Sequence, residues 1–114
     1  IKETRYPGLK DSENHDIASK QMDYFGGMLS FFLEDHINEE KFWKELNLYK
    51  LAVSLGGVET LIEVPYLMTH EKVTGLDGEV INNAPEKLIR ISVGIENIED
   101  LIDDMDSALN ASKK

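Results

Sequence analysis

Residues 88–109 read LIRISVGIENIEDLIDDMDSAL, in which a strand pattern is followed directly by a helix pattern. In its first part Ile89, Ile91 and Val93 alternate with the other side chains, which is the period of a β-strand with two different faces. In its second part apolar side chains recur every three or four residues, which is the period of an amphipathic α-helix. The members of this helical stripe are Ile98, Leu101, Ile102, Met105, Ala108 and Leu109.

Shorter patterns lie on the N-terminal side of this stretch. They predict an extended start, a turn at residues 6–8 and a helix over 13–23 capped by Ser12. A strand over 28–33, a helix from Asn38 and two strands over 48–53 and 60–64 follow. Residues 70–87 have a weak pattern and are predicted as a loop with a short helix. Because helices and strands alternate without long βαβ repeats, we expect a single α+β domain, a small antiparallel or mixed sheet covered by helices.

The composition limits the classes of function. The 114 residues are 41% hydrophobic and 30% charged, with a net charge of −10. This acidity makes nucleic acid and anionic membranes improbable partners, and no apolar run is long enough to span a bilayer. The absence of cysteine excludes disulfides and thiolate chemistry, and it fits a reducing cytoplasm. The tail at residues 111–114 is predicted to be disordered, and the missing initiator Met suggests a fragment or a processed product.

Two groups of side chains could be mistaken for metal sites. The histidines His15, His36 and His70 lack partners at a ligand spacing, so no metal site is predicted. The last predicted helix contains five acids within a short stretch. They surround the apolar stripe, however, and lack the glycine and alternating oxygens of a calcium loop. We interpret them as a solvated helix face; they are Glu99, Asp100, Asp103, Asp104 and Asp106.

Arg90 is the most informative polar residue. It is one of two arginines, and it lies in the middle of the strand predicted over residues 88–93. A guanidinium presents a fixed fork of N–H donors that matches a carboxylate. Position alone leaves two alternatives open, a carboxylate-binding site or a solvent-facing pair with one of the many acids.

Several motifs, taken in order, are more specific than any one of them. They are YPGL at residues 6–9, FGGMLSF at 25–31, LAVSLGGVETLI at 51–62, MTH at 68–70 and LIRISVGIE at 88–96. Together they resemble the C-terminal domain of the cystathionine γ-synthase-like family of cysteine and methionine metabolism. This family includes cystathionine γ-synthase, cystathionine β- and γ-lyases and methionine γ-lyase. The resemblance runs from about residue 5 to residue 109.

The resemblance implies a fold like that of the C-terminal domain of fold-type I transferases that depend on pyridoxal phosphate. It implies that Arg90 holds the α-carboxylate of an amino-acid substrate. Ser54 would present hydrogen-bonding groups to the same carboxylate, and Thr69 would lie beside them. Val53 stands where many cystathionine enzymes of the family have Glu. An apolar wall there suits a thioether and hints at a lyase, with methionine γ-lyase as an alternative.

The resemblance also implies what the chain lacks. Family members hold pyridoxal phosphate on a lysine of a larger N-terminal domain, and none of the ten lysines here has a matching context. We therefore expect no catalytic residue in residues 1–114 and an inactive fragment of an enzyme that makes or breaks C–S bonds. Its expected partners are the amino-acid substrate, its own N-terminal domain and further copies of itself, since the family is usually tetrameric. A free-standing, non-catalytic interaction module is the alternative.

Overall fold

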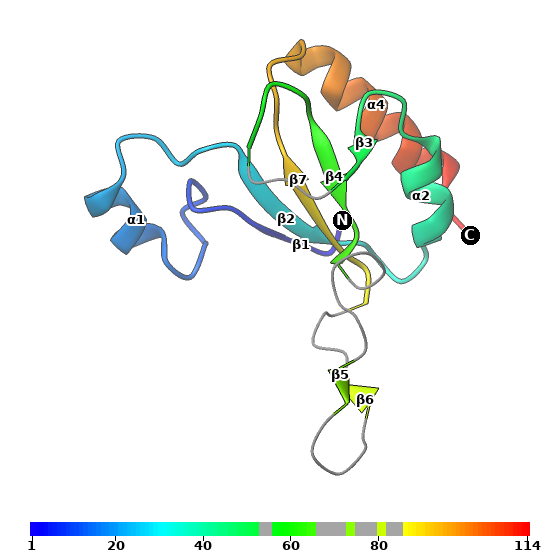
Figure 1. The fold of residues 1–114 in the computed structure, drawn as a ribbon, viewed down its shortest axis with the longest axis horizontal. Helices are drawn as coiled ribbons and strands as arrows, with labels where there is room; N and C mark the ends of the chain where they lie inside the picture. The colour runs from blue at the N-terminus through cyan, green and yellow to red at the C-terminus, as the bar shows by residue number, and fades with distance from the viewer. Residues whose placement is uncertain (53–55, 66–72, 75–79, 82–85) are drawn as a thin grey trace.

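The structure is a computed structural model, and it describes residues 1–52, 56–65, 73–74, 80–81 and 86–114. Its centre is a five-stranded sheet with the strand order β1-β2-β7-β4-β3 (Figure 1). All neighbouring strands are antiparallel except β3 and β4, which are parallel. The strands are β1 (Glu3–Arg5), β2 (Met28–Phe32), β3 (Lys50–Leu51), β4 (Leu61–Glu63) and β7 (Leu88–Ser92).

Two helices cover one face of this sheet. They are α2 (Glu39–Glu45) and α4 (Ile98–Ala111), which pack against each other beside the strands (Figure 1). A third helix, α1 (His15–Gln21), stands away from the sheet at the end of a long excursion between β1 and β2 and buries none of its residues. The structure therefore confirms the predicted α+β class and the mixed sheet.

The hydrophobic core lies between the sheet and the pair α2 and α4. The register places Leu29 opposite Ile91 and Phe31 opposite Ile89, so these four side chains share the face that the helices cover. Phe31 meets Phe42 of α2 edge to face, with their ring centroids 6.2 Å apart. Burial of this face leaves the alternate positions of β2, β4 and β7 on the opposite face, where the candidate site lies.

The predicted strands agree with the structure except in length. Of the strand predicted over residues 48–53, the described residues form only the two-residue strand β3. The helix predicted over residues 13–23 corresponds to α1, which is shorter. The N-cap of α1 is Asn14 rather than Ser12. The backbone N–H of Ser12 donates instead to Leu9 O in the preceding turn. Within residues 70–87, the described pairs 73–74 and 80–81 form a two-stranded antiparallel sheet of β5 (Val73–Thr74) and β6 (Val80–Ile81). At these four residues the structure shows strand where we predicted a loop with a short helix, and the prediction for residues 70–72, 75–79 and 82–85 lies outside the described residues.

The last helix differs from its predicted pattern in two ways. Ile98 and Ile102, both assigned to the apolar stripe, are 61% and 58% exposed. Asp104, assigned to a solvated face, is buried, and its carboxylate accepts hydrogen bonds from Asn47 N and Leu48 N at 2.8–3.0 Å. The interpretation of all five acids as a solvated face was therefore wrong for Asp104, because its partners lie in the segment after α2.

The prediction of a disordered tail was also wrong. Ser112 is fully buried, and its backbone carbonyl accepts a hydrogen bond from Asn38 N at 2.8 Å. Lys114 N donates to His36 O at 2.8 Å, and Lys113 forms a β-bridge with Ile37. Hydrogen bonds with the backbone that precedes α2 therefore hold the tail in place. No local sequence pattern predicts these contacts.

Candidate functional site

The candidate site lies on the face of the sheet that α2 and α4 do not cover. The strand registers pair Arg5 with Ser30, Ser30 with Arg90, and Arg90 with Glu63. Directly paired residues of neighbouring strands point to the same face. A row of polar side chains therefore crosses four strands, from Arg5 on β1 at the edge to Glu63 on β4.

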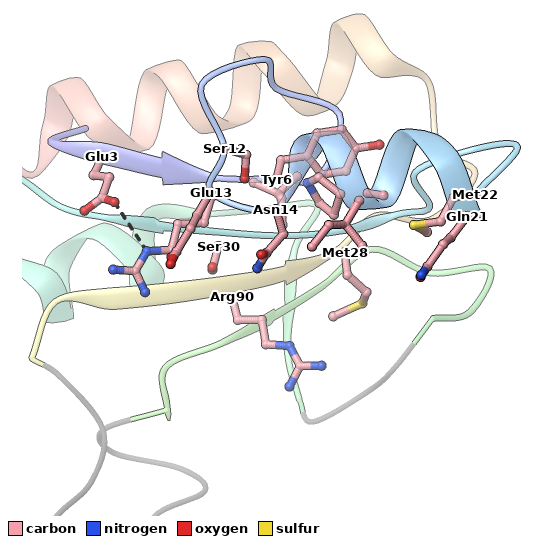
Figure 2. A pocket seen from close by; sticks show the side chains of 15 residues that line it. Glu3, Tyr6, Ser12, Glu13, Asn14, Gln21, Met22, Met28, Ser30 and Arg90 are labelled. Carbon is pink, nitrogen blue, oxygen red and sulfur yellow. Dashed lines mark hydrogen bonds and ion pairs between the residues drawn. The ribbon is translucent and has the colours of Figure 1, made fainter.

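Arg90 occupies the middle of this row. Its side chain is 36% exposed, and its Nη1 lies 3.6 Å from Oε2 of Glu63. Figure 2 shows the guanidinium extending from β7 away from the labelled side chains of Glu13 and Asn14, which precede α1. Arg90 is thus anchored in the central strand of the sheet while its charged end remains accessible.

Arg5, the other arginine, has different surroundings. Its Nε lies 3.4 Å from Glu3 Oε1, and both of these side chains are more than half exposed. Its guanidinium carbon lies 5.0 Å from the centre of the Phe32 ring, at the outer edge of the sheet. Arg5 is therefore engaged at the surface, and Arg90 is the more central guanidinium.

A pocket of about 670 Å³ lies between this face and the excursion that carries α1. Arg90, Ser30 and Met28 line its sheet side, and residues before and within α1 line the other side (Figure 2). The excursion holds its shape through its own contacts. Tyr6 Oη donates to Gly26 O at 2.7 Å, and His15 Nδ1 lies 2.7 Å from Pro7 O.

The arrangement can bind an anion that has two oxygens. A guanidinium offers five N–H donors in a planar fork, and a carboxylate accepts two of them in parallel. No lysine lines the pocket among the residues that the structure describes, so the described lining of this pocket holds no amine to which pyridoxal phosphate could be attached. The side chains present therefore fit the carboxylate of a ligand, and they do not fit a covalent cofactor anchor.

The structure places one of the four predicted site residues. Arg90 lies on the open face of the sheet, as described above, whereas Val53, Ser54 and Thr69 lie outside the described residues. Gly56, next to this segment, has φ +106°, a backbone conformation that residues other than glycine rarely adopt.

Glu63 was missed by the sequence analysis. Its side chain is 6% exposed, although it is a carboxylate that follows the apolar residues Leu61 and Ile62. The signal that could have found it is the antiparallel pairing of the strand over residues 60–64 with the strand over 88–93. That pairing puts Glu63 directly opposite Arg90.

The chain is thus an α+β domain that carries a central, accessible guanidinium on the open face of its sheet. The chain belongs to the family of Cys/Met metabolism PLP-dependent enzymes, whose family model matches residues 1–110. The resemblance stated above is thereby confirmed.

Individual relatives agree with this assignment. A cystathionine β-lyase of Lactococcus lactis subsp. cremoris is 48% identical over 96% of this chain and 28% of its own length. A cystathionine γ-lyase of Sus scrofa is 42% identical over 98% of this chain and 28% of its own length. The solved structure of cystathionine γ-synthase from Xanthomonas oryzae pv. oryzae in complex with cystathionine matches with a TM-score of 0.83 and 36% identity, over 97% of this chain and 29% of that one.

The match with this solved structure supports the prediction of a fold like that of these pyridoxal-phosphate enzymes. The chain spans about 28% of the length of the curated relatives that it matches. Among the described residues, no helix is both long enough and apolar enough to cross a membrane.

Proposed function

We propose that residues 1–114 are the C-terminal domain of a pyridoxal-phosphate-dependent enzyme that makes or breaks C–S bonds of cystathionine-, homocysteine- or methionine-type amino acids. In this proposal Arg90 binds the α-carboxylate of the substrate. The observation that carries the proposal is the accessible guanidinium of Arg90 at the centre of the open face, in a chain whose relatives are cystathionine lyases and synthases.

The contribution of this chain is to bind and orient the substrate. Arg90 lies in β7, which has a strand on either side, so the position of its backbone is fixed before a ligand arrives. Two parallel hydrogen bonds to a carboxylate fix its position and the orientation of its plane. A substrate held in this way keeps its α-carbon close to one position, which lowers the entropic part of the barrier.

The cofactor supplies a sink for the electrons of a carbanion when it is bound. We place its lysine and its larger binding domain outside these 114 residues, so this chain alone is expected to be inactive. Ser54 and Thr69 complete the proposed carboxylate site, and Val53 forms the proposed apolar wall for a thioether side chain.

The proposal has three further parts. The chain contacts the cofactor-binding domain of its own protein, and the whole enzyme is a homo-oligomer. The enzyme works in the cytoplasm, which is consistent with a sequence free of cysteine. If the protein that contains this chain lacked a cofactor-binding domain, the alternative of a non-catalytic interaction module would take the place of the proposal.

The test uses the full-length enzyme with Arg90→Ala and Arg90→Lys. We expect Arg90→Ala to raise KM for the amino-acid substrate roughly 10- to 100-fold, because a charged hydrogen-bonding partner is lost. Arg90→Lys should lie in between, since an ammonium keeps the charge but not the fork. Lys44→Ala is the control, because this exposed lysine pairs with Glu40 on α2. An unchanged KM in Arg90→Ala would refute the assignment.

A binding measurement separates carboxylate recognition from general damage. Glycine and methylamine differ by one carboxylate, and binding of either is followed by the visible absorption of the bound cofactor. Arg90→Ala should weaken glycine binding and leave methylamine binding unchanged. Equal weakening of both ligands would mean that Arg90 does not recognise the carboxylate.

A further inference from the structure

Glu63 is a buried carboxylate whose partner is the proposed ligand-binding arginine. The β4–β7 register places Glu63 directly opposite Arg90, and Oε2 of Glu63 lies 3.6 Å from Nη1 of Arg90. The two side chains differ sharply in accessibility, at 6% exposed for Glu63 and 36% for Arg90. The carboxylate therefore lies on the protein side of the pair and the guanidinium on the solvent side.

The burial of Glu63 calls for a compensating charge. Among the described residues, its Oε2 accepts no hydrogen bond and its ion-pair partner is Arg90. Removing a carboxylate from water is costly unless it is paired, and a partly exposed pair of this kind adds little to stability. Stability of the fold thus gives no reason for an acid at this position.

The geometry gives another reason. The 3.6 Å contact with Glu63 involves Nη1 of Arg90, which is one nitrogen of a guanidinium that has five N–H donors in all. A charge fixed behind Arg90 restricts the rotamers of this long side chain and sets the direction in which its fork points. A ligand carboxylate in front of Arg90 would then complete an alternating row of negative, positive and negative charge.

We propose that Glu63 is a positioning residue, which holds the Arg90 guanidinium in the orientation that receives the substrate carboxylate. This inference rests on the proposed function of Arg90. Without Glu63 the guanidinium would have to be ordered each time a substrate binds, and the entropic cost of ordering it would weaken binding. The same loss applies to the ground state and to the transition state, so it changes KM and leaves kcat unchanged.

The experiment uses the full-length enzyme with Glu63→Gln, a substitution that removes the charge and preserves the shape of the side chain. We expect KM for the amino-acid substrate to rise about ten-fold while kcat stays within about two-fold. Glu63→Asp keeps the charge at a shorter reach and should restore part of the affinity. Glu59→Gln is the matched control, because Glu59 is 56% exposed and pairs with Lys50 at 3.0 Å.

Two readouts distinguish positioning from a general structural role. Glu63→Gln should weaken the binding of glycine and leave the binding of methylamine unchanged, as measured from the visible absorption of the bound cofactor. In an Arg90→Ala background, Glu63→Gln should raise KM no further, because residues that act through one another are not additive.

The outcomes separate the two proposals. If Arg90→Ala leaves KM unchanged, the function proposed for Arg90 fails, and the role of Glu63 fails with it. If Arg90→Ala raises KM but Glu63→Gln does not, or if the two effects add fully, the positioning role alone is overturned. Should Glu63→Gln fail to fold, Glu63→Asp provides the same comparison, and equal weakening of glycine and methylamine would overturn the inference.

Discussion

Replacing Asp104 with alanine should destabilise the protein far more than its place in an acidic helix suggests. Its carboxylate accepts hydrogen bonds from Asn47 N at 2.9 and 3.0 Å, from Asn47 Nδ2 at 3.3 Å and from Leu48 N at 2.8 Å. These contacts join α4 to the segment that follows α2, so one side chain connects the two helices that cover the sheet.

The magnitude follows from the loss of these bonds. A hydrogen bond to a charged group contributes about 1.5–3 kcal/mol, and three donors lose their acceptor in Asp104→Ala. Asn47 and Leu48 are themselves exposed, so water replaces part of what is lost. We therefore expect a decrease of about 2–4 kcal/mol in the free energy of unfolding, well below the sum of the separate bonds. Asp104→Asn retains one acceptor and should lose about half as much.

The assay is urea unfolding of the purified protein, followed by the fluorescence of Trp43. Asp103→Ala is the matched control, because Asp103 is the exposed neighbour of Asp104 on α4. Both substitutions gain the same helix propensity, about 0.5 kcal/mol, so the difference between them isolates the buried hydrogen bonds. Equal stability of Asp103→Ala and Asp104→Ala, within about 0.5 kcal/mol, would refute this reasoning.

Three further predictions concern other parts of the described chain. Gly94→Ala should destabilise the fold by at least about 2 kcal/mol in urea unfolding, because a Cβ at this position would lie 2.6 Å from Thr60 N. Gly57→Ala should be neutral, because no atom of the described residues lies within 4 Å of a Cβ placed there. The pKa of Glu96 is lowered because the backbone and side chain of Thr60 donate to its carboxylate. Its stabilisation is therefore present at neutral pH and is lost as the pH falls below its ordinary value of 4.5, so Glu96→Gln should be less stable than the wild type at pH 7 and equal to it in acid. Burial, followed by nearby acids, raises the pKa of Tyr49 from 10.0 to about 12. The wild type should therefore lose stability between these two pH values, and Tyr49→Phe should show no such loss in alkaline unfolding curves.

The sequence predicts three strands of the central sheet well, because the pattern of their side chains is a local property of the sequence. Residues 28–33, 60–64 and 88–93 contain continuous β-prone runs or a clean alternation, and each corresponds to a strand of the central sheet. Asp104 could not be predicted in the same way, because its partner Asn47 lies 57 residues away. The tail is a similar case, since Ser112 is fixed by the backbone of Asn38 and by no pattern of its own.

The candidate site shows the same limit. Arg90 stands out in the sequence because it is one of two arginines and lies in the middle of a predicted strand, between apolar neighbours. Glu63 does not stand out, because an acid in a strand is ordinarily a solvent-facing residue. Its burial depends on the register of β4 against β7, and a shift of one residue would turn it to the opposite face.

The two faces of the sheet therefore meet different requirements. The face against α2 and α4 is apolar and close-packed, which is what stability favours. The other face buries Glu63 beside Arg90, although a buried ion pair is commonly no better for stability than apolar side chains of the same volume. A sheet under selection for stability alone would place apolar residues at these two paired positions. A ligand that reaches Arg90 from solvent would explain why this pair is present. A ligand carboxylate would complement the Arg90 guanidinium on the side opposite to Glu63.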